Sequence, residues 1–329
     1  SICNPTFGYS RKEKGVKNII YKIKQNGGFV NAHSHIDRSN TSHYFSKSEQ
    51  YLFLKEKWKL VDKIKSESSF SSYKKRMLKC IQDQKEFGVT ALLSFIDIDD
   101  VAGFRAIEAA AEVRSETQIN FKIACQTLKG ALNKKYESMI EQQMHSIDII
   151  GSLPSADVDK ALHLDKVMSW AKKYNKRLHV HVDQLNTSEE KETELLARKT
   201  IQWGLEEKVT AVHSISLACH PKNYRNEVYK MSRDAGLSFV SCPSAWIDHP
   251  RREDLAPIHN SITPADELIE NDLIVAIGSD NIMDVYKPYC DGNMLFELRM
   301  LLEACKIYDE DQLVKIATTN GKKVLGIKE

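Results

Sequence analysis

The sequence of 329 residues predicts an α/β fold, specifically a (β/α)8 barrel of the TIM type. Eight short runs rich in β-branched and aromatic residues recur along the chain, and longer amphipathic segments lie between them, as a series of strand–helix units requires. The first run leads into "HSHIDRSNT" instead of a GxGxxG phosphate loop, which argues against an open, doubly wound nucleotide-binding sheet. Eight repeats in one chain therefore favour a barrel.

The expected strands are short and follow one another along the whole chain. They cover residues 28–35, 89–97, 119–127, 147–150, 177–182, 209–214, 237–242 and 273–280. Amphipathic segments suited to helices cover residues 101–116, 158–174 and 189–205, and residues 303–327 close the chain with a helix followed by a turn. Because no low-complexity linker divides the chain, we expect a single barrel domain over residues 1–329, with residues 1–27 as an N-terminal extension.

Charge balance and cysteine pattern restrict the class of partner. Lys and Arg total 47 against 45 Asp and Glu, a formal net charge of +2, so we expect a small-molecule partner and neither nucleic acid nor a membrane. No run approaches the roughly 18 apolar residues that span a bilayer, and no secretory signal opens the chain, so we expect a cytoplasmic protein. The seven cysteines include no CxxC pair, which indicates neither a disulfide framework nor a cysteine zinc cage.

Polar residues with chemical capacity stand where the expected strands end. In a (β/α)8 barrel the carboxyl ends of the strands form the active-site face, so these side chains should gather there. They are His33 and His35 after the first strand, Gln126 after the third, His179, His181, Asp183 and Gln184 around the end of the fifth, His213 after the sixth and Asp280 after the eighth. The alternative interpretations are a polar strand end for the first pair, a buried core histidine for His213 and a loop cap for Asp280.

Two histidine pairs with the spacing HxH suggest a metal site. Residues two apart on a strand point to the same face, so His33 and His35 can converge on one ion. The same alternation lets either His179 or His181 reach it and does not choose between them. Two or three imidazoles with one carboxylate and an open position are typical of a catalytic zinc or iron site. Asp280 then suits a ligand that also acts as a base, and His213 suits a group that orients water or stabilises developing charge.

At these residues the sequence resembles the amidohydrolase superfamily, in particular its cytosine deaminase and N-isopropylammelide hydrolase branch. The resemblance covers almost the whole chain. It rests on "GFVNAHSHID", "TALLSFIDIDD", "KIACQ", "DIIGSLP", "HVDQ", "VTAVHS", "GSDNIMDVY" and the closing "ATTNGKKVLGI". It implies a barrel of the metal-dependent hydrolase type.

The resemblance also implies roles for individual residues. It implies that one divalent metal ion, which we expect to be zinc with iron as the alternative, is bound by His33, His35, His181 and Asp280. His213 would hydrogen-bond the water held there, Gln126 would read an amide or ring edge of the substrate, and Tyr286 would lie against the substrate ring. His179 becomes a neighbour deeper in the barrel. Ser152 and Leu153, after the fourth strand, offer no side chain that could bridge two metals, so we expect a mononuclear site.

Two residues depart from the deaminase pattern. The glutamate that carries a proton to the ring is replaced by Gln184, and an amide cannot transfer a proton near neutral pH. The residue after the metal-binding aspartate is Asn281 where a second aspartate is usual. We expect both residues to contact the substrate. The small β-sandwich usual in the family is expected to be reduced or absent, because residues 1–27 and those after Leu325 are too few to build it.

These observations predict a metal-dependent hydrolase of carbon–nitrogen bonds in a small cyclic amide or amino-substituted nitrogen heterocycle. One alternative is a cytosine-type deaminase in which Asp183, His179 or a water replaces the missing glutamate. The other is a barrel that binds a metal and a ligand without catalysis. Association into a homo-oligomer is left open by the sequence.

Overall fold

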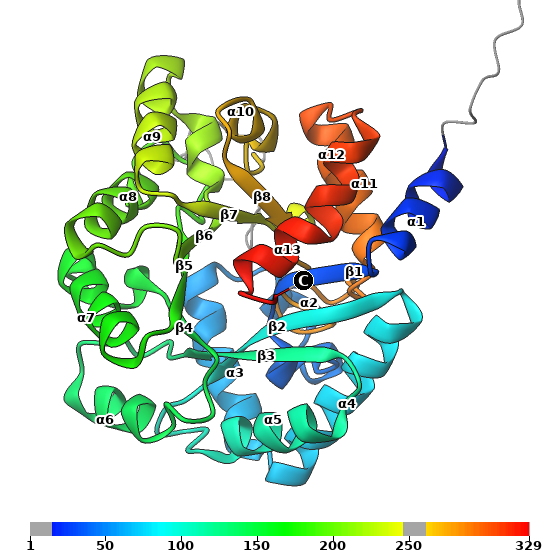
Figure 1. Ribbon diagram of the computed structural model, residues 1–329. Coiled ribbons are helices and arrows are strands. Elements are labelled where there is room, and N and C mark those ends of the chain that lie inside the picture. The colour runs from blue at the N-terminus through cyan, green and yellow to red at the C-terminus, as the bar shows by residue number, and fades with distance from the viewer. Residues whose placement is uncertain (1–14, 246–260, 329) are drawn as a thin grey trace, which may run out of the picture.

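The computed structural model describes residues 15–245 and 261–328. Within them, eight parallel strands form one sheet in the order of the sequence, β1 to β8, and helices surround it (Figure 1). The strands are β1 Phe29–Ser34, β2 Val89–Asp97, β3 Asn120–Gln126, β4 Ile149–Ser152, β5 Arg177–Val182, β6 Val209–His213, β7 Ser238–Ser241 and β8 Ile274–Ile277. A parallel bridge between Ser34 and Asp280 joins the ends of β1 and β8, so the barrel is nearly closed. The predicted (β/α)8 fold is confirmed.

Each predicted strand is present, but the strands that lead to the site are shorter than predicted. β1 ends one residue before His35, and β8 ends three residues before Asp280. The reason is local: Asp280 has a φ of 58°, which an extended strand cannot have. Its N–H donates to the carbonyl of His33 at 2.9 Å, and its carbonyl accepts from the N–H of His35 at 3.2 Å. The end of the eighth unit is therefore held against β1 by hydrogen bonds outside the regular ladder.

The helices follow the predicted pattern. They are α1 Val16–Gln25, α2 Lys47–Gln50, α3 Leu54–Glu67, α4 Phe70–Glu86, α5 Arg105–Glu116, α6 Lys134–Gln142, α7 Lys160–Tyr174, α8 Glu192–Trp203, α9 Lys222–Asp234, α10 Ala265–Glu270, α11 Met294–Cys305, α12 Glu310–Ala317 and α13 Thr319–Val324. The prediction of one helix and a turn over residues 303–327 was wrong. α11 ends at Cys305, and α12 and α13 are separated by Thr318, whose φ of −132° and ψ of −87° interrupt the helix.

Apolar side chains fill both faces of the sheet. Val30 and Leu93 belong to a buried cluster within the barrel, whereas their neighbours Phe29 and Leu92 belong to the cluster between the strands and the helices. This alternation follows from the two faces of a strand. A parallel sheet covered by helices is buried on both sides, which explains why the strands are nearly continuous apolar runs.

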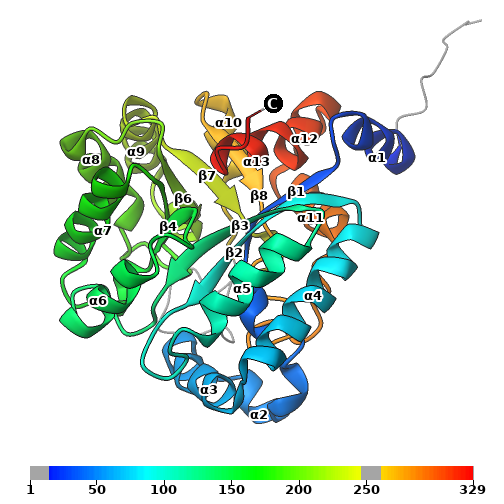
Figure 2. The same cartoon turned by 60° about the horizontal axis from the view of Figure 1, so that its bottom comes forward.

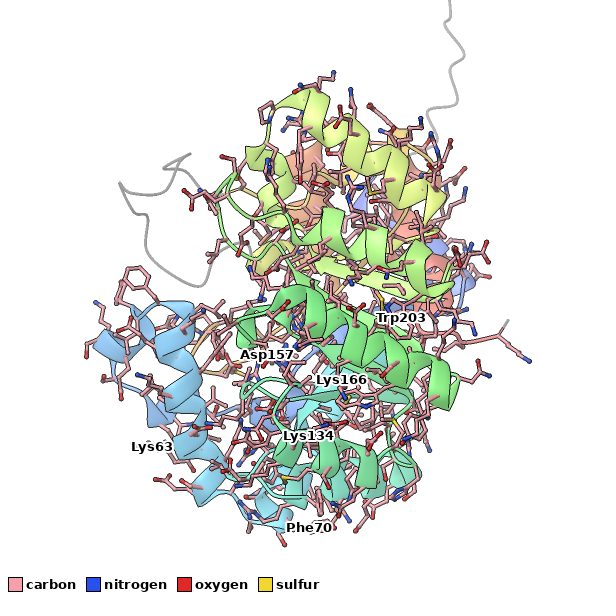
Figure 3. All side chains as sticks on the ribbon, turned by 90° about the vertical axis from the view of Figure 1, so that its left-hand side faces the viewer. Lys63, Phe70, Lys134, Asp157, Lys166 and Trp203 are labelled. Carbon is pink, nitrogen blue, oxygen red and sulfur yellow. The ribbon has the colours of Figure 1, made fainter. Side chains whose placement is uncertain are left out.

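The helices pack around the outside of the sheet (Figure 2), and ion pairs connect neighbouring ones. Lys166 of α7 lies 2.7 Å from Glu137 of α6, and Lys199 of α8 lies 2.7 Å from Asp165 of α7. The indole N–H of Trp203, which is labelled in Figure 3, also donates to Asp165. Partly exposed ion pairs of this kind contribute little each, typically about 0.2–1 kcal/mol, so burial of the apolar faces stabilises the fold.

The expected N-terminal extension of residues 1–27 lies partly outside the described residues, which begin at Gly15. Its described part forms α1, in which Asn18 and Lys22 contact Glu310 of α12 at 2.9 Å. In the part of the chain that the structure describes, every helix is too short or too polar to cross a membrane. The described cysteines are all free, and Cys3 lies outside the described residues.

Candidate metal centre

Four of the predicted side chains meet at the carboxyl ends of the strands. His33 lies near the end of β1 and His35 follows it, His181 is on β5, and Asp280 follows β8. Nε2 of His33 and Nε2 of His35 lie 3.3 and 3.2 Å from Oδ1 of Asp280. Nε2 of His181 lies 3.4 Å from Nε2 of His35. The ends of β1, β5 and β8 therefore bring these donor atoms close together, and those of His33, His35 and Asp280 all lie within 4.8 Å of one another.

The separations of these atoms fit a metal ion. Ligand atoms at 2.0–2.1 Å from a tetrahedral zinc ion lie roughly 3.3 Å from one another, close to the three separations measured here. Nε2 of His33 is fully buried and makes no hydrogen bond within the described residues. A buried ring nitrogen that makes no hydrogen bond is rare in a stable fold, and a bound cation would accept its lone pair. The residues present therefore fit a single ion, and they could hold it.

The protonation states also suit a cation. Burial lowers the pKa of His33 to about 3 and holds the pKa values of His35 and His181 well below the ordinary histidine value. Burial opposes ionisation of Asp280, but the contacts with His33 and His35 outweigh it and keep the pKa of this carboxyl well below its ordinary value. Neutral imidazoles and an ionised carboxylate are the forms that bind metals.

His213 lies at the edge of the same cluster. Its ring centroid is 5.4 Å from those of His33 and His181, and one of its ring nitrogens lies within 4.8 Å of theirs. Its buried Nδ1 has no hydrogen-bond partner among the described residues. The geometry therefore allows His213 either to contact a water beside the ion or to approach the ion itself.

Backbone strain is concentrated in the turns that position these groups. Asp183, His213, Ser214 and Asp280 all have positive φ, between 50° and 77°, a region that residues with a side chain seldom adopt. Strain of this kind persists only where the surrounding structure imposes it, and it is common at functional sites. Gly278 shows how tight the packing is, because a Cβ at this position would lie 2.7 Å from the Cβ of His33.

The predicted substrate-binding residues border one small cavity beside the cluster. Its lining comprises His35, His181, His213 and Asp280, the predicted Gln126, Gln184, Asn281 and Tyr286, and the unpredicted Arg38, Leu54, Trp58, Leu128 and Leu153. The cavity has a volume of about 20 Å³, which is room for roughly one water. Oε1 of the buried Gln126 has no hydrogen-bond partner within the described residues, so it is free to accept from a ligand.

Arg38 is the functional candidate that sequence reasoning missed. It follows "HSHID" directly and is 6 % exposed, although the pattern gave no sign of burial because most arginines are at the surface. Its guanidinium donates to Oδ1 of Asn281 and lies over the ring of Tyr286, with Cζ 5.2 Å from the ring centroid. In the sequence, the only indication that Arg38 could belong to the site was its position directly after a predicted metal-binding motif.

His179 and Asp183 do not border the cavity. Nε2 of His179 lies 2.9 Å from the carbonyl oxygen of Val324, at the opposite end of the barrel. The carboxylate of Asp183 accepts from the N–H groups of Glu192 and Thr193 at the start of α8, at 2.7 and 3.0 Å. Both side chains therefore have structural partners away from the donor cluster.

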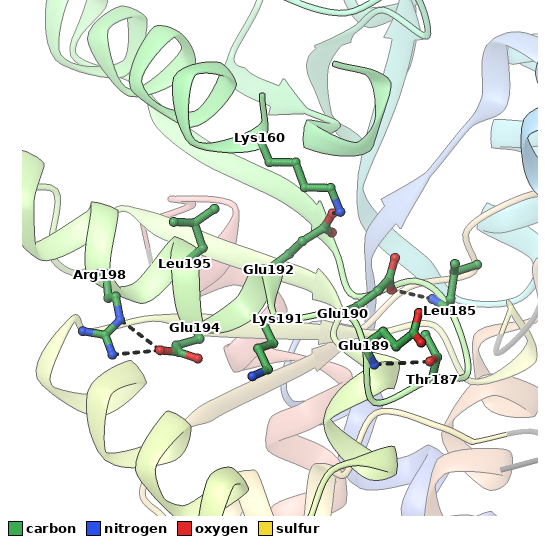
Figure 4. A pocket seen from close by; sticks show the side chains of 10 residues that line it. All are labelled: Lys160, Leu185, Thr187, Glu189, Glu190, Lys191, Glu192, Glu194, Leu195 and Arg198. Atoms are coloured by element: carbon green, nitrogen blue, oxygen red, sulfur yellow. Dashed lines mark hydrogen bonds and ion pairs between the residues drawn. The ribbon is translucent and has the colours of Figure 1, made fainter. Parts of the chain in front are cut away.

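Two larger pockets lie on the same side of the molecule. One, of about 530 Å³, shares Leu54 and Gln184 with the small cavity. The other, of about 610 Å³, shares Lys160, Leu185 and Glu190 with the first (Figure 4). Gln184 thus lines both the small cavity and a larger pocket next to it.

An eight-stranded parallel barrel with histidines and a carboxylate at the carboxyl ends of its strands has the architecture of an enzyme. The chain belongs to the amidohydrolase family, whose sequence pattern matches residues 45–329. It is accordingly a hydrolase that acts on carbon–nitrogen bonds.

Several known proteins are similar to this chain. An uncharacterised protein of Haemophilus influenzae is 40 % identical over 260 residues, which cover 75 % of this chain and 92 % of that protein. An N-isopropylammelide isopropyl amidohydrolase of Pseudomonas sp. is 26 % identical over 316 residues, 92 % of this chain and 75 % of that protein. The crystal structure of 5-methylcytosine deaminase from Klebsiella pneumoniae has a TM-score of 0.81 at 22 % identity, covering 91 % of this chain and 75 % of that one.

Proposed function

We propose that this protein hydrolyses a carbon–nitrogen bond in a small cyclic amide or amino-substituted nitrogen heterocycle, using one divalent metal ion held by His33, His35, His181 and Asp280. The observation that carries the proposal is that three pairs among these donor atoms are 3.2 to 3.4 Å apart, beside a small cavity lined in part by amide side chains. Two similar proteins with assigned activities are named for N-isopropylammelide and 5-methylcytosine, which are both nitrogen heterocycles. We expect zinc, with iron as the alternative.

The residues of the cavity divide the chemistry between them. A metal ion bound there would lower the pKa of a water and polarise the carbon under attack. The carboxylate of Asp280 would accept the proton of the attacking water and pass it to the departing nitrogen. His213 would donate a hydrogen bond to the oxygen that becomes negative in the tetrahedral state, while Gln126 and Tyr286 hold the ring in position.

Gln184 separates this proposal from ordinary cytosine deamination. Its side chain borders the cavity, where an amide can donate and accept hydrogen bonds but cannot carry a proton at neutral pH. The substitutes considered for the missing glutamate, Asp183 and His179, have partners elsewhere, at the start of α8 and at Val324. Gln184 is thus proposed to orient the substrate, and proton transfer is left to Asp280.

The test is a metal analysis followed by a substrate screen. The purified protein should contain about one equivalent of zinc or iron and should release ammonia or an amine from a member of a panel of pyrimidines, aminopurines, triazines and cyclic amides. Asp280→Asn serves as the blank. A protein that takes up no metal would refute the proposed ligand set, whereas a metal-loaded protein without turnover on any of these classes would favour a non-catalytic binding barrel.

A further inference from the structure

Arg38 is a buried cation in the wall of the cavity, and one of its guanidinium nitrogens makes no hydrogen bond within the described residues. Its Nε and Nη2 donate to Oδ1 of Asn281 at 3.1 and 3.0 Å, and its Nε lies 3.4 Å from Oδ2 of Asp284. Its Nη1 makes no hydrogen bond within the described residues, and Oδ2 of Asp97 is 3.9 Å away. A guanidinium has five N–H donors, so at least the two on Nη1 are available to a ligand.

The surroundings fix both the charge and the position of this guanidinium. Burial alone would lower the pKa of Arg38, but Tyr286, Asp97 and Asp37 together raise it above its ordinary value. Asp97 is not free to move toward Nη1, because Nζ of Lys65 already lies 2.8 Å from its Oδ2. The planar group is therefore held in one orientation beside the cavity.

The amide side chains of the cavity complement this donor. Oδ1 of Asn281 is occupied by Arg38, whereas Oε1 of Gln126 is a buried acceptor without a partner in the described residues. The lining of the cavity thus includes a residue with an unused hydrogen-bond donor, Nη1 of Arg38, and a residue with an unused acceptor, Oε1 of Gln126. A ring that carries a C=O group or its oxyanion together with an N–H can satisfy both, whereas a ring that carries only amino groups offers Arg38 no oxygen.

We propose that Arg38 determines specificity by binding an oxo or oxyanionic group of the ring, so that the substrate is an oxo-substituted nitrogen heterocycle. This inference rests on the proposed function, because it names the class of ring that the same site hydrolyses. Arg38 acts here through hydrogen bonds from a fixed planar group, which a lysine cannot reproduce.

The test compares rings that differ in one exocyclic group. The metal-loaded protein, Arg38→Met and Arg38→Lys are assayed for turnover with matched oxo- and amino-substituted 1,3,5-triazines, and for binding alone with 4-amino-2-oxopyrimidine against 2,4-diaminopyrimidine. Binding of each ring is also measured by calorimetry, which does not require turnover. We expect the natural protein to prefer the oxo member of a pair, and both variants to lose about 10- to 100-fold in kcat/KM or affinity for that member alone.

The matched control is Arg76→Met. Arg76 also bears a partly buried guanidinium, which donates to the carbonyl of Asp37 at 2.9 Å and to Oγ of Ser68 at 2.7 Å, but it does not border the cavity. Its loss should leave the oxo preference unchanged.

The outcomes separate this inference from the proposed function. Equal losses on oxo and amino rings in Arg38→Met would assign Arg38 a structural role and overturn the inference, and turnover without an oxo preference would do the same. If no ring of either kind is bound or hydrolysed by the metal-loaded protein, the proposed function is wrong and the inference falls with it.

Discussion

Nδ1 of His181 lies 3.0 Å from the carbonyl oxygen of Ser152, the last residue of the neighbouring strand β4. This contact assigns the N–H of the ring to Nδ1 and leaves the lone pair of Nε2 directed at the donor cluster. Oγ of Ser152 in turn lies 2.9 Å from Nε2 of His163, whose Nδ1 lies 2.6 Å from Oδ2 of Asp157. A chain of hydrogen bonds therefore runs from α7 to the end of β4, where the carbonyl holds His181.

Breaking this chain should weaken metal binding without touching a ligand. We expect His163→Leu to lower zinc affinity by about 10-fold, because partners that orient a ligand typically contribute 10- to 100-fold. The measurement is competition with a chromogenic chelator. His145→Leu, at an exposed histidine, is the control. Unchanged affinity in His163→Leu would mean that β4 fixes His181 without help from the side chains.

Asp280→Asn should abolish both metal retention and turnover. The change removes the negative charge that lies 3.2 Å from His35 and the base assigned to the attacking water. Loss of such a base typically costs 10²- to 10⁴-fold in kcat, and metal content measured by atomic absorption should fall as well. Asp272→Asn, at an exposed turn residue with a φ of 61°, should change neither quantity. An Asp280→Asn protein that keeps its metal and its activity would contradict the site.

Gln184→Glu should raise cytosine deamination. The new carboxyl would border the cavity where the deaminase pattern has its proton carrier, so a rise of about 10²-fold or more in kcat/KM is expected. Ammonia release from cytosine measures it, and Gln202→Glu, on the exposed side of α8, controls for the added charge. A variant as inactive as the parent would show that Gln184 is not what prevents this reaction.

Gly278→Ala should destabilise the barrel where β8 meets β1. The added Cβ would lie 2.7 Å from both Cβ and the carbonyl oxygen of His33, so β1 or β8 must shift. Overpacking of this kind costs about 1–3 kcal/mol in the free energy of unfolding, which urea denaturation measures. Gly15→Ala adds a methyl group in open space and should have little effect by comparison. Equal stabilities for the two variants would show that the closure is not tightly packed.

Binding of a ring should move Trp58. The cavity holds about 20 Å³, far less than a heterocycle needs, and Trp58 and Leu54 of α3 form part of its wall. We therefore expect a change in tryptophan fluorescence when a substrate ring binds, and its loss in Trp58→Phe. Trp203→Phe, on the outer face of α8, should retain the change. A signal that persists in Trp58→Phe would place the movement elsewhere.

The sequence alone predicted much of this architecture. The alternation of short apolar runs with amphipathic segments predicted eight strand–helix units, because each run must bury both faces under helices. The strand ends predicted where His33, His35 and Asp280 would gather, because parallel strands in a barrel end on one face. The family membership expected from the same motifs was confirmed by the match to residues 45–329.

Only the tertiary structure determined how far along its strand each side chain lies and which residues from distant segments surround it. His179 and His181 face the same way, so alternation could not separate them. The two histidines are two residues apart, which is roughly 6.6 Å along the strand. His179 therefore contacts Val324, whereas His181 lies in the donor cluster. Arg38 became a candidate only when its burial and its bonds to Asn281, 243 residues away, were known. Periodicity encodes the face of a strand, but only packing determines which remote groups surround a side chain.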